Sequence, residues 1–297
     1  MKLKRLLTFL KCPYCELAEL RLESKTRLIC GKCSKLFSII DGIPVLMRKA
    51  SLGRQEKCQL NWFENHYSQF SKEDYRLENW RLSMLKRIFD NRPKKINTYL
   101  DLGCGATGYT VIEGARRNKW LSFGADISFE AMLRAKALAG KQGVAERTGF
   151  VVCSAERLPF KDNLFDYVSA ISLLEHLEND LQVIKGVSRI VKEKGAVYVC
   201  VPNTYKRMWP FLWPVYFWID KNIGHKRHYS IENLSLKMAK EGFRLDRVFY
   251  NGHLIKLLQL TLEKLRLINE ENWWQLEKKD LNRNPMGIQL NAVYTKI

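Results

Sequence analysis

From residue 96 onward, short strand-like runs alternate with helical runs, and this alternation constrains the fold of the 297-residue chain more than any other feature. The strand-like runs are 98–102, 121–125, 149–153, 167–172, 196–201, 243–250 and 289–297, and the main helical runs are 108–118, 129–141, 181–191 and 231–241. Such alternation is typical of a parallel sheet with helices on both faces. We therefore predict an α/β fold with a doubly wound, mostly parallel, seven-stranded sheet.

The rest of the sequence divides the chain into three predicted parts. Residues 1–48 form a small β-rich module that begins with a short basic strand over 4–9, and 49–95 form a helical linker or cap. Residues 96–297 form the α/β domain, with insertions on the substrate side at about 204–230 and 251–286. A chain of this length with 46% hydrophobic residues can bury one full core and still carry a small module.

Four cysteines in the first module form two CxxC pairs, which fourteen residues separate; they are Cys12, Cys15, Cys30 and Cys33. This spacing is typical of two knuckles whose thiolates bind one zinc ion in a tetrahedral site. Disulfide bonds or free thiols are the alternative. The four remaining cysteines are scattered among apolar or glycine-rich stretches, which favours a reducing compartment. We predict a zinc ribbon with a structural Zn²⁺.

A glycine-bearing loop follows the first strand of the α/β domain and opens the next helix; its glycines are Gly103, Gly105 and Gly108. Such a loop lets the backbone and the amides of a helix N-terminus approach a ligand closely. Nicotinamide dinucleotides use the same device, and Asp126 lies where an acid would bind ribose in either case. Asp101 would repel a pyrophosphate but suits the cationic end of a methionine moiety, which favours S-adenosylmethionine. Both aspartates have an alternative role as turn or capping residues.

These motifs resemble those of class I S-adenosylmethionine-dependent methyltransferases of the type 11 kind, from about residue 96 to 201 and more loosely to 243. The resemblance implies that Asp126 binds both ribose hydroxyls, that Ile127 lies against the adenine, and that Ser154 or Glu156 accepts from its amino group. The implied cofactor-binding set is Asp101, Gly103, Gly105, Gly108, Asp126, Ile127, Ser154, Ala155 and Glu156. The first 48 residues also resemble the zinc-ribbon family that activates methyltransferases, in which the ribbon is structural or a docking surface.

Two histidines are the candidate catalytic residues. Methyl transfer depends mainly on alignment of the acceptor, and a base is needed only for a hydroxyl or a protonated amine. His176 lies in the run Leu173–Leu177, which resembles a motif common in the family, although Glu175 and His176 have a helix-capping alternative. His225 begins a His/Arg/Tyr stretch similar to one in glycan- and lipid-associated members, with a solvated cationic loop as the alternative. Tyr67 is a candidate cover for the methionine end of the cofactor.

The predicted methyl acceptor is a small molecule, a sugar or a lipid-linked precursor. The insertions are rich in aromatic residues, which favours lids over the substrate site rather than an open groove. The stretch from Trp209 to Trp218 is able to close a pocket, to contact a membrane surface or to pack on the helical run 254–267. An RNA methyltransferase is the alternative, since the formal net charge is +19. A non-catalytic binding protein is the second alternative. We expect no signal peptide and no transmembrane helix, and hence a cytoplasmic protein with peripheral membrane contact as an option.

Overall fold

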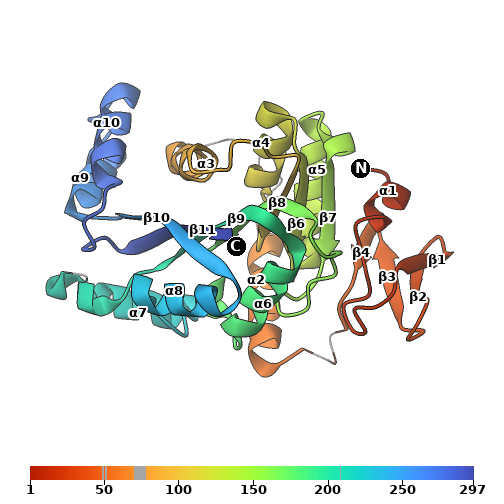
Figure 1. Ribbon diagram of the computed structural model, residues 1–297. Helices are drawn as coiled ribbons and strands as arrows, with labels where there is room; N and C mark the ends of the chain where they lie inside the picture. Colours follow the sequence, from red (N-terminus) through yellow and green to blue (C-terminus); the bar gives the residue numbers. More distant parts are fainter. Residues whose placement is uncertain (49, 51, 70–77, 208) are drawn as a thin grey trace.

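One mixed sheet of eleven strands runs through the molecule in the order β1-β2-β3-β4-β7-β6-β5-β8-β9-β11-β10 (Figure 1). The computed structural model describes residues 1–48, 50, 52–69, 78–207 and 209–297. The strands are β1 (Leu20–Ser24), β2 (Arg27–Cys30), β3 (Leu36–Ile40), β4 (Ile43–Val45), β5 (Thr98–Leu102), β6 (Leu121–Asp126), β7 (Thr148–Val152), β8 (Phe165–Ile171), β9 (Val191–Pro202), β10 (Phe243–Asn251) and β11 (Gln289–Lys296).

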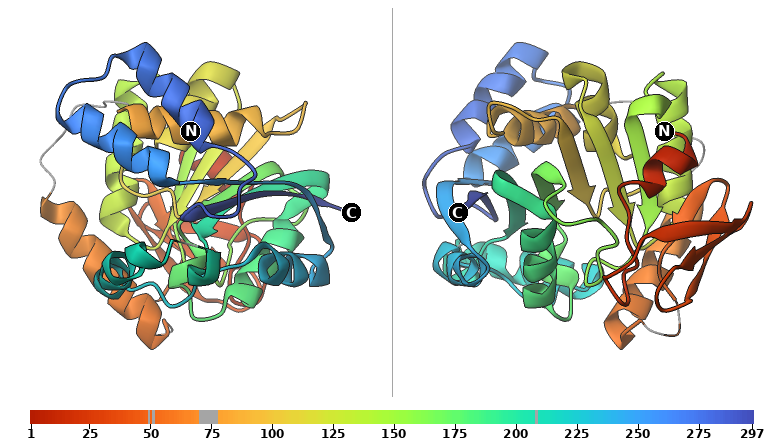
Figure 2. Two further views of the ribbon diagram at one scale, coloured as in Figure 1. Left: turned by 90° about the vertical axis from the view of Figure 1, so that its left-hand side faces the viewer. Right: turned by 45° about the vertical axis from the view of Figure 1, so that its right-hand side comes forward.

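Helices cover both faces of the sheet, with α3, α4 and α5 on one face and α6 and α8 on the other (Figures 1 and 2). The α-helices are α1 (Leu3–Leu7), α2 (Arg54–Gln69), α3 (Asn79–Asp90), α4 (Tyr109–Asn118), α5 (Phe129–Lys141), α6 (Asp180–Ile190), α7 (Trp213–Ile223), α8 (Ile231–Lys240), α9 (Leu254–Lys264) and α10 (Glu270–Asp280). Short 3₁₀ turns include η3 (Leu174–His176), η4 (Tyr205–Arg207) and η5 (Pro210–Leu212). None of the described helices combines the length and hydrophobicity that a bilayer span requires.

The predicted α/β architecture is confirmed. Strands β7, β6, β5, β8 and β9 pair in parallel, and β11 is antiparallel to both of its neighbours, β9 and β10. Apolar side chains of α4 and α5 fill the core on one face, and those of α6 and α8 fill the core on the other. This burial of both faces explains why the central strands read as nearly continuous apolar runs in the sequence.

The predicted count of seven strands is wrong for the sheet as a whole. Strand β4 of the N-terminal module pairs in parallel with β7 through Val45 and Val152, so the four strands β1–β4 extend the sheet. The amide of Leu46 also donates to the carbonyl of Val152 at 2.8 Å. An uncovered β7 edge would expose unpaired backbone groups, and the N-terminal module covers that edge. Seven strands lie after residue 96, as predicted, among the residues that the structure describes.

The strand predicted over residues 4–9 is also wrong, because α1 lies there instead. Leu3, Leu6 and Leu7 have the spacing of one helical face, and Leu6 is buried at 3% exposure. The N-terminal ammonium donates to the carbonyl of Thr148 at 2.8 Å, which fixes the helix beside β7. Helices α2 and α3 lie within the segment 49–95 that was predicted to be helical.

Candidate active site

A cavity of about 200 Å³ lies at the carboxyl ends of the central strands, where β5, β6 and β8 run into loops. Ligand sites of open α/β sheets occur at this edge, where the strand order reverses. The lining side chains come from the loops after these strands, from α2 and from the turn around η3. They are Glu56, Gln59, Leu102, Gly103, Ala125, Asp126, Ile127, Cys153, Ala155, Ser172, Leu173, His176, Leu177 and Glu178.

The glycine loop after β5 adopts backbone conformations that other residues rarely take. Gly103, Gly105 and Gly108 have φ angles of 77°, 62° and 49°. A Cβ atom on Gly108 would lie 2.9 Å from the Cβ of Ala135, so this glycine also lets α4 approach α5 closely. Gly103 lines the cavity, which leaves its backbone accessible to a ligand. Of the three predicted glycines, Gly103 is on the described lining of the cavity, and the cofactor-binding role of the loop stays a prediction.

Asp126 ends β6 and lines the cavity. One of its carboxylate oxygens accepts from the amide of Gly105 and the other from the amide of Ser128, each at 3.0 Å. Burial raises the pKa of Asp126, and these amide donors oppose that shift. Each oxygen has a second acceptor position, so the carboxylate is able to bind two neighbouring hydroxyl donors.

Asp101 has a different environment from the predicted one, since its carboxylate does not lie on the described lining of the cavity. The residue is buried at 3% exposure, and its oxygens accept from the hydroxyls of Thr110 and of Ser169, the latter at 2.6 Å. Burial raises the pKa of Asp101 to about 6. The hydroxyl of Ser169 in turn contacts that of Tyr99 at 2.6 Å. In this arrangement Asp101 joins β5, β8 and α4 beneath the glycine loop.

The segment after β7 contains the three residues predicted to lie near the adenine, Ser154, Ala155 and Glu156. Ala155 lines the main cavity, while Ser154 and Glu156 line a second cavity that also contacts Leu46 and Met47 of the N-terminal module. The hydroxyl of Ser154 donates to the carboxylate of Glu56 and accepts from the amide of Glu156 at 3.1 Å. The side chain of Glu156 accepts from the amide of Asn179 at 3.1 Å.

Glu56 is a site residue that the sequence reasoning missed. It lies on α2 and lines both cavities, and Gln59 of the same helix lines the first. Glu64, further along α2, accepts from the amide of Phe129 at 2.8 Å and so ties α2 to the start of α5. The spacing of α2 indicates an amphipathic helix, and nothing local marks which of its acids faces a ligand. The side chain of Tyr67, the predicted cover, lies outside the described residues.

His176 and His225 come together at one end of the cavity. His176 lies in η3, lines the cavity and is buried at 7% exposure. Burial and the neighbouring His225 lower the pKa of His176 to about 4, so its ring is neutral at pH 7. The two ring centroids lie 4.8 Å apart, and His225 lies behind His176 rather than on the described lining.

A network of acids supports the two histidines. Nδ1 of His225 lies 2.6 Å from Oδ1 of Asp220, and Nε2 of His228 lies 2.7 Å from Oδ2 of the same carboxylate. Glu175 is fully buried, and burial raises its pKa to about 8. His225 is therefore part of a packed cluster, and the alternative of a solvated loop does not describe it. Arg227 pairs with Asp180 at 2.9 Å.

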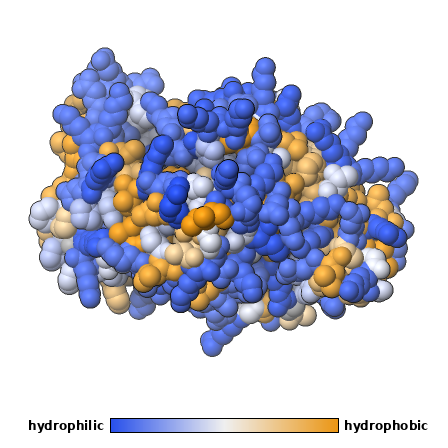
Figure 3. Space-filling model, viewed as in Figure 1, coloured by the Kyte–Doolittle hydropathy of each residue, from blue (hydrophilic) through white to orange (hydrophobic). Residues whose placement is uncertain are grey.

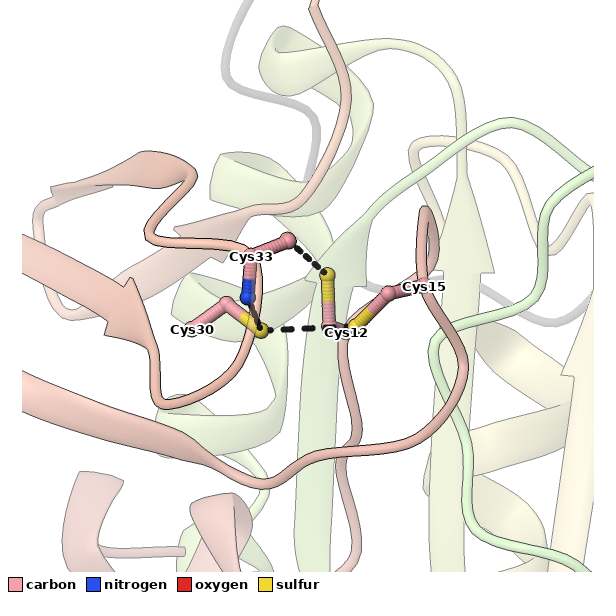
Figure 4. A group of neighbouring side chains, drawn as sticks. All are labelled: Cys12, Cys15, Cys30 and Cys33. Atoms are coloured by element: carbon pink, nitrogen blue, oxygen red, sulfur yellow. Dashed lines mark hydrogen bonds between the residues drawn. The ribbon is translucent and has the colours of Figure 1, made fainter.

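The four cysteines of the two CxxC pairs converge in the N-terminal module (Figure 4). The sulfurs of Cys12 and Cys33 lie 3.7 Å apart and those of Cys15 and Cys30 lie 3.5 Å apart, and all four lie within 4.8 Å of one another. Sulfurs bound to one tetrahedral zinc ion at about 2.3 Å would lie roughly 3.8 Å apart. None of the four forms a disulfide bond in the structure, which leaves a metal site or free thiols as the two readings.

The aromatic stretch of the first insertion lies largely at the surface. Phe211, Phe217 and Trp218 are exposed by 62%, 67% and 67%, and Trp209 and Trp213 are also exposed. Packing on α9 therefore does not bury these five side chains. Figure 3 shows a largely hydrophilic face with hydrophobic residues on the side where α7 and α9 lie and also on the opposite side, where the N-terminal module lies. On α9, Leu257, Leu258 and Leu260 are exposed as well.

Comparison with known proteins agrees with this geometry. Residues 100–199, which include the glycine loop and Asp126, match the methyltransferase domain family. The chain is 32% identical over 123 residues to norajmaline N-methyltransferase from Rauvolfia serpentina, a match that covers 41% of each protein. Across the first three curated relatives, the chain spans only 41% to 54% of their length.

Solved structures show the same fold. Geranyl diphosphate C-methyltransferase from Streptomyces coelicolor A3(2) superposes with a TM-score of 0.60 at 12% identity, over 84% of this chain and all of that one. Phosphoethanolamine N-methyltransferase 2 from Haemonchus contortus, bound to S-adenosyl-L-methionine, gives a TM-score of 0.59 at 18% identity, over 85% of this chain and 61% of that one. Residues 100–199 thus match a methyltransferase domain family, and the chain shares the Rossmann-like fold of these solved methyltransferases.

Proposed function

We propose that this chain is a methyltransferase that transfers a methyl group from S-adenosylmethionine to a small-molecule, sugar or lipid-linked acceptor. The observation that carries the proposal is the placement of Asp126 on the cavity beside the glycine loop. A carboxylate at this position suits two vicinal ribose hydroxyls, because it has acceptor capacity left after binding the amides of Gly105 and Ser128.

In this proposal the other lining residues have the following roles. Ile127 and Ala155 offer apolar surface for the adenine, and Glu56, whose carboxylate also accepts from the hydroxyl of Ser154, offers an oxygen acceptor. The methionine end of the donor would then lie near Gly103 and the loop after β8. S-Adenosylmethionine supplies an electrophilic methyl group, so the protein mainly has to align an acceptor behind the methyl carbon and exclude water.

His176 and His225 form the catalytic side of the cavity in this proposal. His176 is neutral and lines the cavity, and His225 lies behind it in contact with Asp220. If the methyl acceptor must lose a proton, this pair of histidines would receive it. We expect His176→Ala to lower kcat while leaving the affinity for the donor within about twofold.

The N-terminal module has the role of a structural zinc ribbon in the proposal. The sulfurs of Cys12, Cys15, Cys30 and Cys33 fit one tetrahedral ion, and a module this small buries little core of its own. The proposed division of the chain stays at residues 1–48, 49–95 and 96–297. Three further cysteines, Cys104, Cys153 and Cys200, are buried free thiols, which supports a reducing compartment such as the cytoplasm.

The exposed aromatic side chains of η5 and α7 support contact with a membrane surface and therefore a lipid-linked acceptor. Lys206, Lys221 and Lys226 are exposed around them and would meet anionic headgroups. We expect the chain to co-sediment with phosphatidylglycerol vesicles and Phe217→Asp/Trp218→Asp to abolish this. Leu17→Asp, at a residue 70% exposed on the opposite end of the sheet, is the matched control. Equal sedimentation of both variants would refute membrane contact through α7.

The acceptor is identified by labelling. The full chain is incubated with donor carrying a radioactive methyl group and with fractionated small molecules, lipids and RNA, and the labelled fraction is then isolated. The proposal predicts label in small molecules or lipids. Label in RNA, with binding that weakens steeply as salt rises, would favour the alternative that the +19 charge suggests. Donor binding without transfer to any fraction would indicate a binding protein.

A further inference from the structure

Five metal-ligating side chains meet beside the cavity from three separate segments. Asp220 lies in the last turn of α7, His225 and His228 lie in the loop that follows, and Glu175 and His176 lie in η3. The ligand atoms of Glu175, His176 and His225 lie within 4.8 Å of one another, and so do those of Asp220, His225 and His228. His225 belongs to both groups, so the two form one continuous cluster.

The cluster holds two buried acids without a matching lysine or arginine. Glu175 has 0% exposure and Asp220 has 9%, and neither forms an ion pair with Lys or Arg among the described residues. Two cations of the intervening loop are directed elsewhere, since Lys226 pairs with Glu178 and Arg227 with Asp180. Burying carboxylates in this way is unfavourable unless protons or a cation balance them.

Glu175 is the clearest sign that a partner belongs in the cluster. Its carboxylate lies near its own amide and the side chain of Ser172, which oppose the rise in pKa that burial causes, but neither oxygen has a well-aligned hydrogen bond within the described part of the chain. The backbone carbonyl of the same residue accepts from the amide of Lys226 at 2.9 Å, which holds η3 against the loop that carries His225. A cation bound between this buried carboxylate and the neighbouring imidazole rings would supply the partner that its two oxygens lack.

His228 is oriented as a metal ligand is. Its Nδ1 lies 2.6 Å from the carbonyl oxygen of Asn203 and therefore carries the proton. In the neutral ring Nε2 then has a lone pair, and this lone pair faces Oδ2 of Asp220 at 2.7 Å. The hydroxyl of Tyr205 also donates to this oxygen, and a second proton or a metal ion at Nε2 of His228 would relieve the repulsion between the two acceptors.

We propose that Asp220, His225 and His228, with Glu175 and His176 beside them, bind one divalent transition-metal ion such as Mn²⁺, Fe²⁺ or Zn²⁺. Mixed imidazole and carboxylate ligands suit these ions, whereas the four thiolates of the ribbon select zinc. Because His176 lines the cavity, the ion would lie beside the acceptor and favour an oxygen nucleophile, whose hydroxyl pKa it would lower. That last consequence rests on the proposed methyl transfer, but the binding of the ion does not.

The test is a titration of the full chain with Mn²⁺. Binding is measured as the loss of the free-ion signal in electron paramagnetic resonance. The ribbon is kept loaded with zinc, and neither donor nor acceptor is added, so the result is independent of methyl transfer. We expect one Mn²⁺ per chain, with imidazole nitrogen couplings on the bound ion. Asp220→Asn and His228→Gln should each weaken binding at least tenfold. Asp246→Asn, which changes an acid outside the cluster, should leave binding unchanged.

A wild-type chain that binds no Mn²⁺ overturns the proposal. Binding that shows no nitrogen coupling overturns it too, because the ion would then lie on surface carboxylates. The same holds if the Asp220→Asn chain, shown by its melting curve to be folded, binds Mn²⁺ as tightly as wild type. The wild-type stoichiometry and the nitrogen coupling decide the matter even where a variant fails to fold. In every one of these outcomes donor binding at Asp126 remains testable on its own.

Discussion

Two aspartates near the glycine loop differ in what surrounds them, and this difference is the basis of the separate roles that we propose for them. Asp126 lines the cavity and keeps acceptor capacity after binding two amides, so it is placed to bind ribose. Asp101 lies beneath the loop, where the hydroxyls of Thr110 and Ser169 occupy its oxygens. Its contribution in this arrangement is to hold β5 and α4 in position rather than to face the donor's ammonium group.

Asp126→Ala should weaken the affinity for S-adenosylmethionine roughly 100-fold, because it removes two hydrogen bonds to a charged acceptor at about 1.5 kcal/mol or more each. Isothermal titration calorimetry measures this change. Asp126→Asn is the matched variant, and it should lose less affinity since one acceptor oxygen remains. Both variants need a melting curve, because Asp126 also binds the amides of Gly105 and Ser128. Unchanged affinity in the alanine variant would refute the ribose role.

The burial of Asp101 predicts a pH dependence of stability. The folded chain holds the proton up to a pKa of about 6, whereas the unfolded chain releases it near 3.8. The folded state therefore binds more protons in this window, and its free energy of unfolding falls by roughly 3 kcal/mol as the pH rises from about 4 to about 6. Asp101→Asn should flatten that part of the profile. Urea denaturation across this range tests it, and parallel profiles for both chains would show that Asp101 does not titrate there.

At the scale of single residues, sequence reasoning located the glycine loop and Asp126 but missed Glu56. The loop and Asp126 are local, since each follows directly from the end of a strand. Glu56 meets Ser154 only because α2 crosses the cavity, a contact between residues 98 positions apart. For Asp101 the sequence motif located the residue at the end of its strand but not the direction of its side chain. That direction depends on a hydrogen bond with Ser169 of another strand.

Among the secondary-structure elements, α2 has the most direct effect on the cavity. It contributes Glu56 and Gln59 to the lining, and its Glu64 accepts from the amide of Phe129 at the start of α5. The core elements were predictable because their periodicity is set by burial on two faces; α5 matches its predicted range. The start of the chain was not, because α1 depends on the contact of Leu6 with the main core and of the N-terminus with Thr148.

Removal of the Glu56 side chain should show that α2 takes part in donor binding. We expect Glu56→Ala to raise the dissociation constant for S-adenosylmethionine about fivefold to tenfold, since one oxygen acceptor near the adenine end is lost. Fluorescence or calorimetric titration gives the value. Glu146→Ala, at an exposed acid outside this cavity, serves as the control. Equal affinities of the two variants for S-adenosylmethionine would show that the Glu56 carboxylate does not take part in donor binding.

On the scale of the whole molecule, the N-terminal module and the α/β domain form one sheet and share a core. Leu10, Leu28 and Phe37 of the module belong to the same apolar cluster as Phe123 and Phe160. The sequence predicted the module by its cysteines but not its union with β7, because strand pairing between distant segments leaves no local pattern. A substitution in the module should therefore also change the stability of the α/β domain.

Removal of the ribbon's metal should destabilise the whole chain. We expect a strong chelator under reducing conditions to lower the melting temperature by several degrees, because the ion's binding free energy contributes to folding. Metal analysis should find zinc in the wild-type chain, less in Cys30→Ser and an unchanged amount in Cys58→Ser, whose cysteine is exposed and outside the cluster. A metal-free chain that melts at the wild-type temperature would contradict a structural role.

The proposal of methyl transfer depends first on which ligand the main cavity accepts. Equilibrium dialysis of the full chain against labelled S-adenosylmethionine, with S-adenosylhomocysteine and a nicotinamide dinucleotide as competitors, measures this directly. We predict one donor molecule per chain, displaced by S-adenosylhomocysteine, unaffected by the dinucleotide and lost in Asp126→Ala. Displacement by the dinucleotide, or donor binding that survives in the Asp126→Ala chain, would contradict the assignment of this cavity.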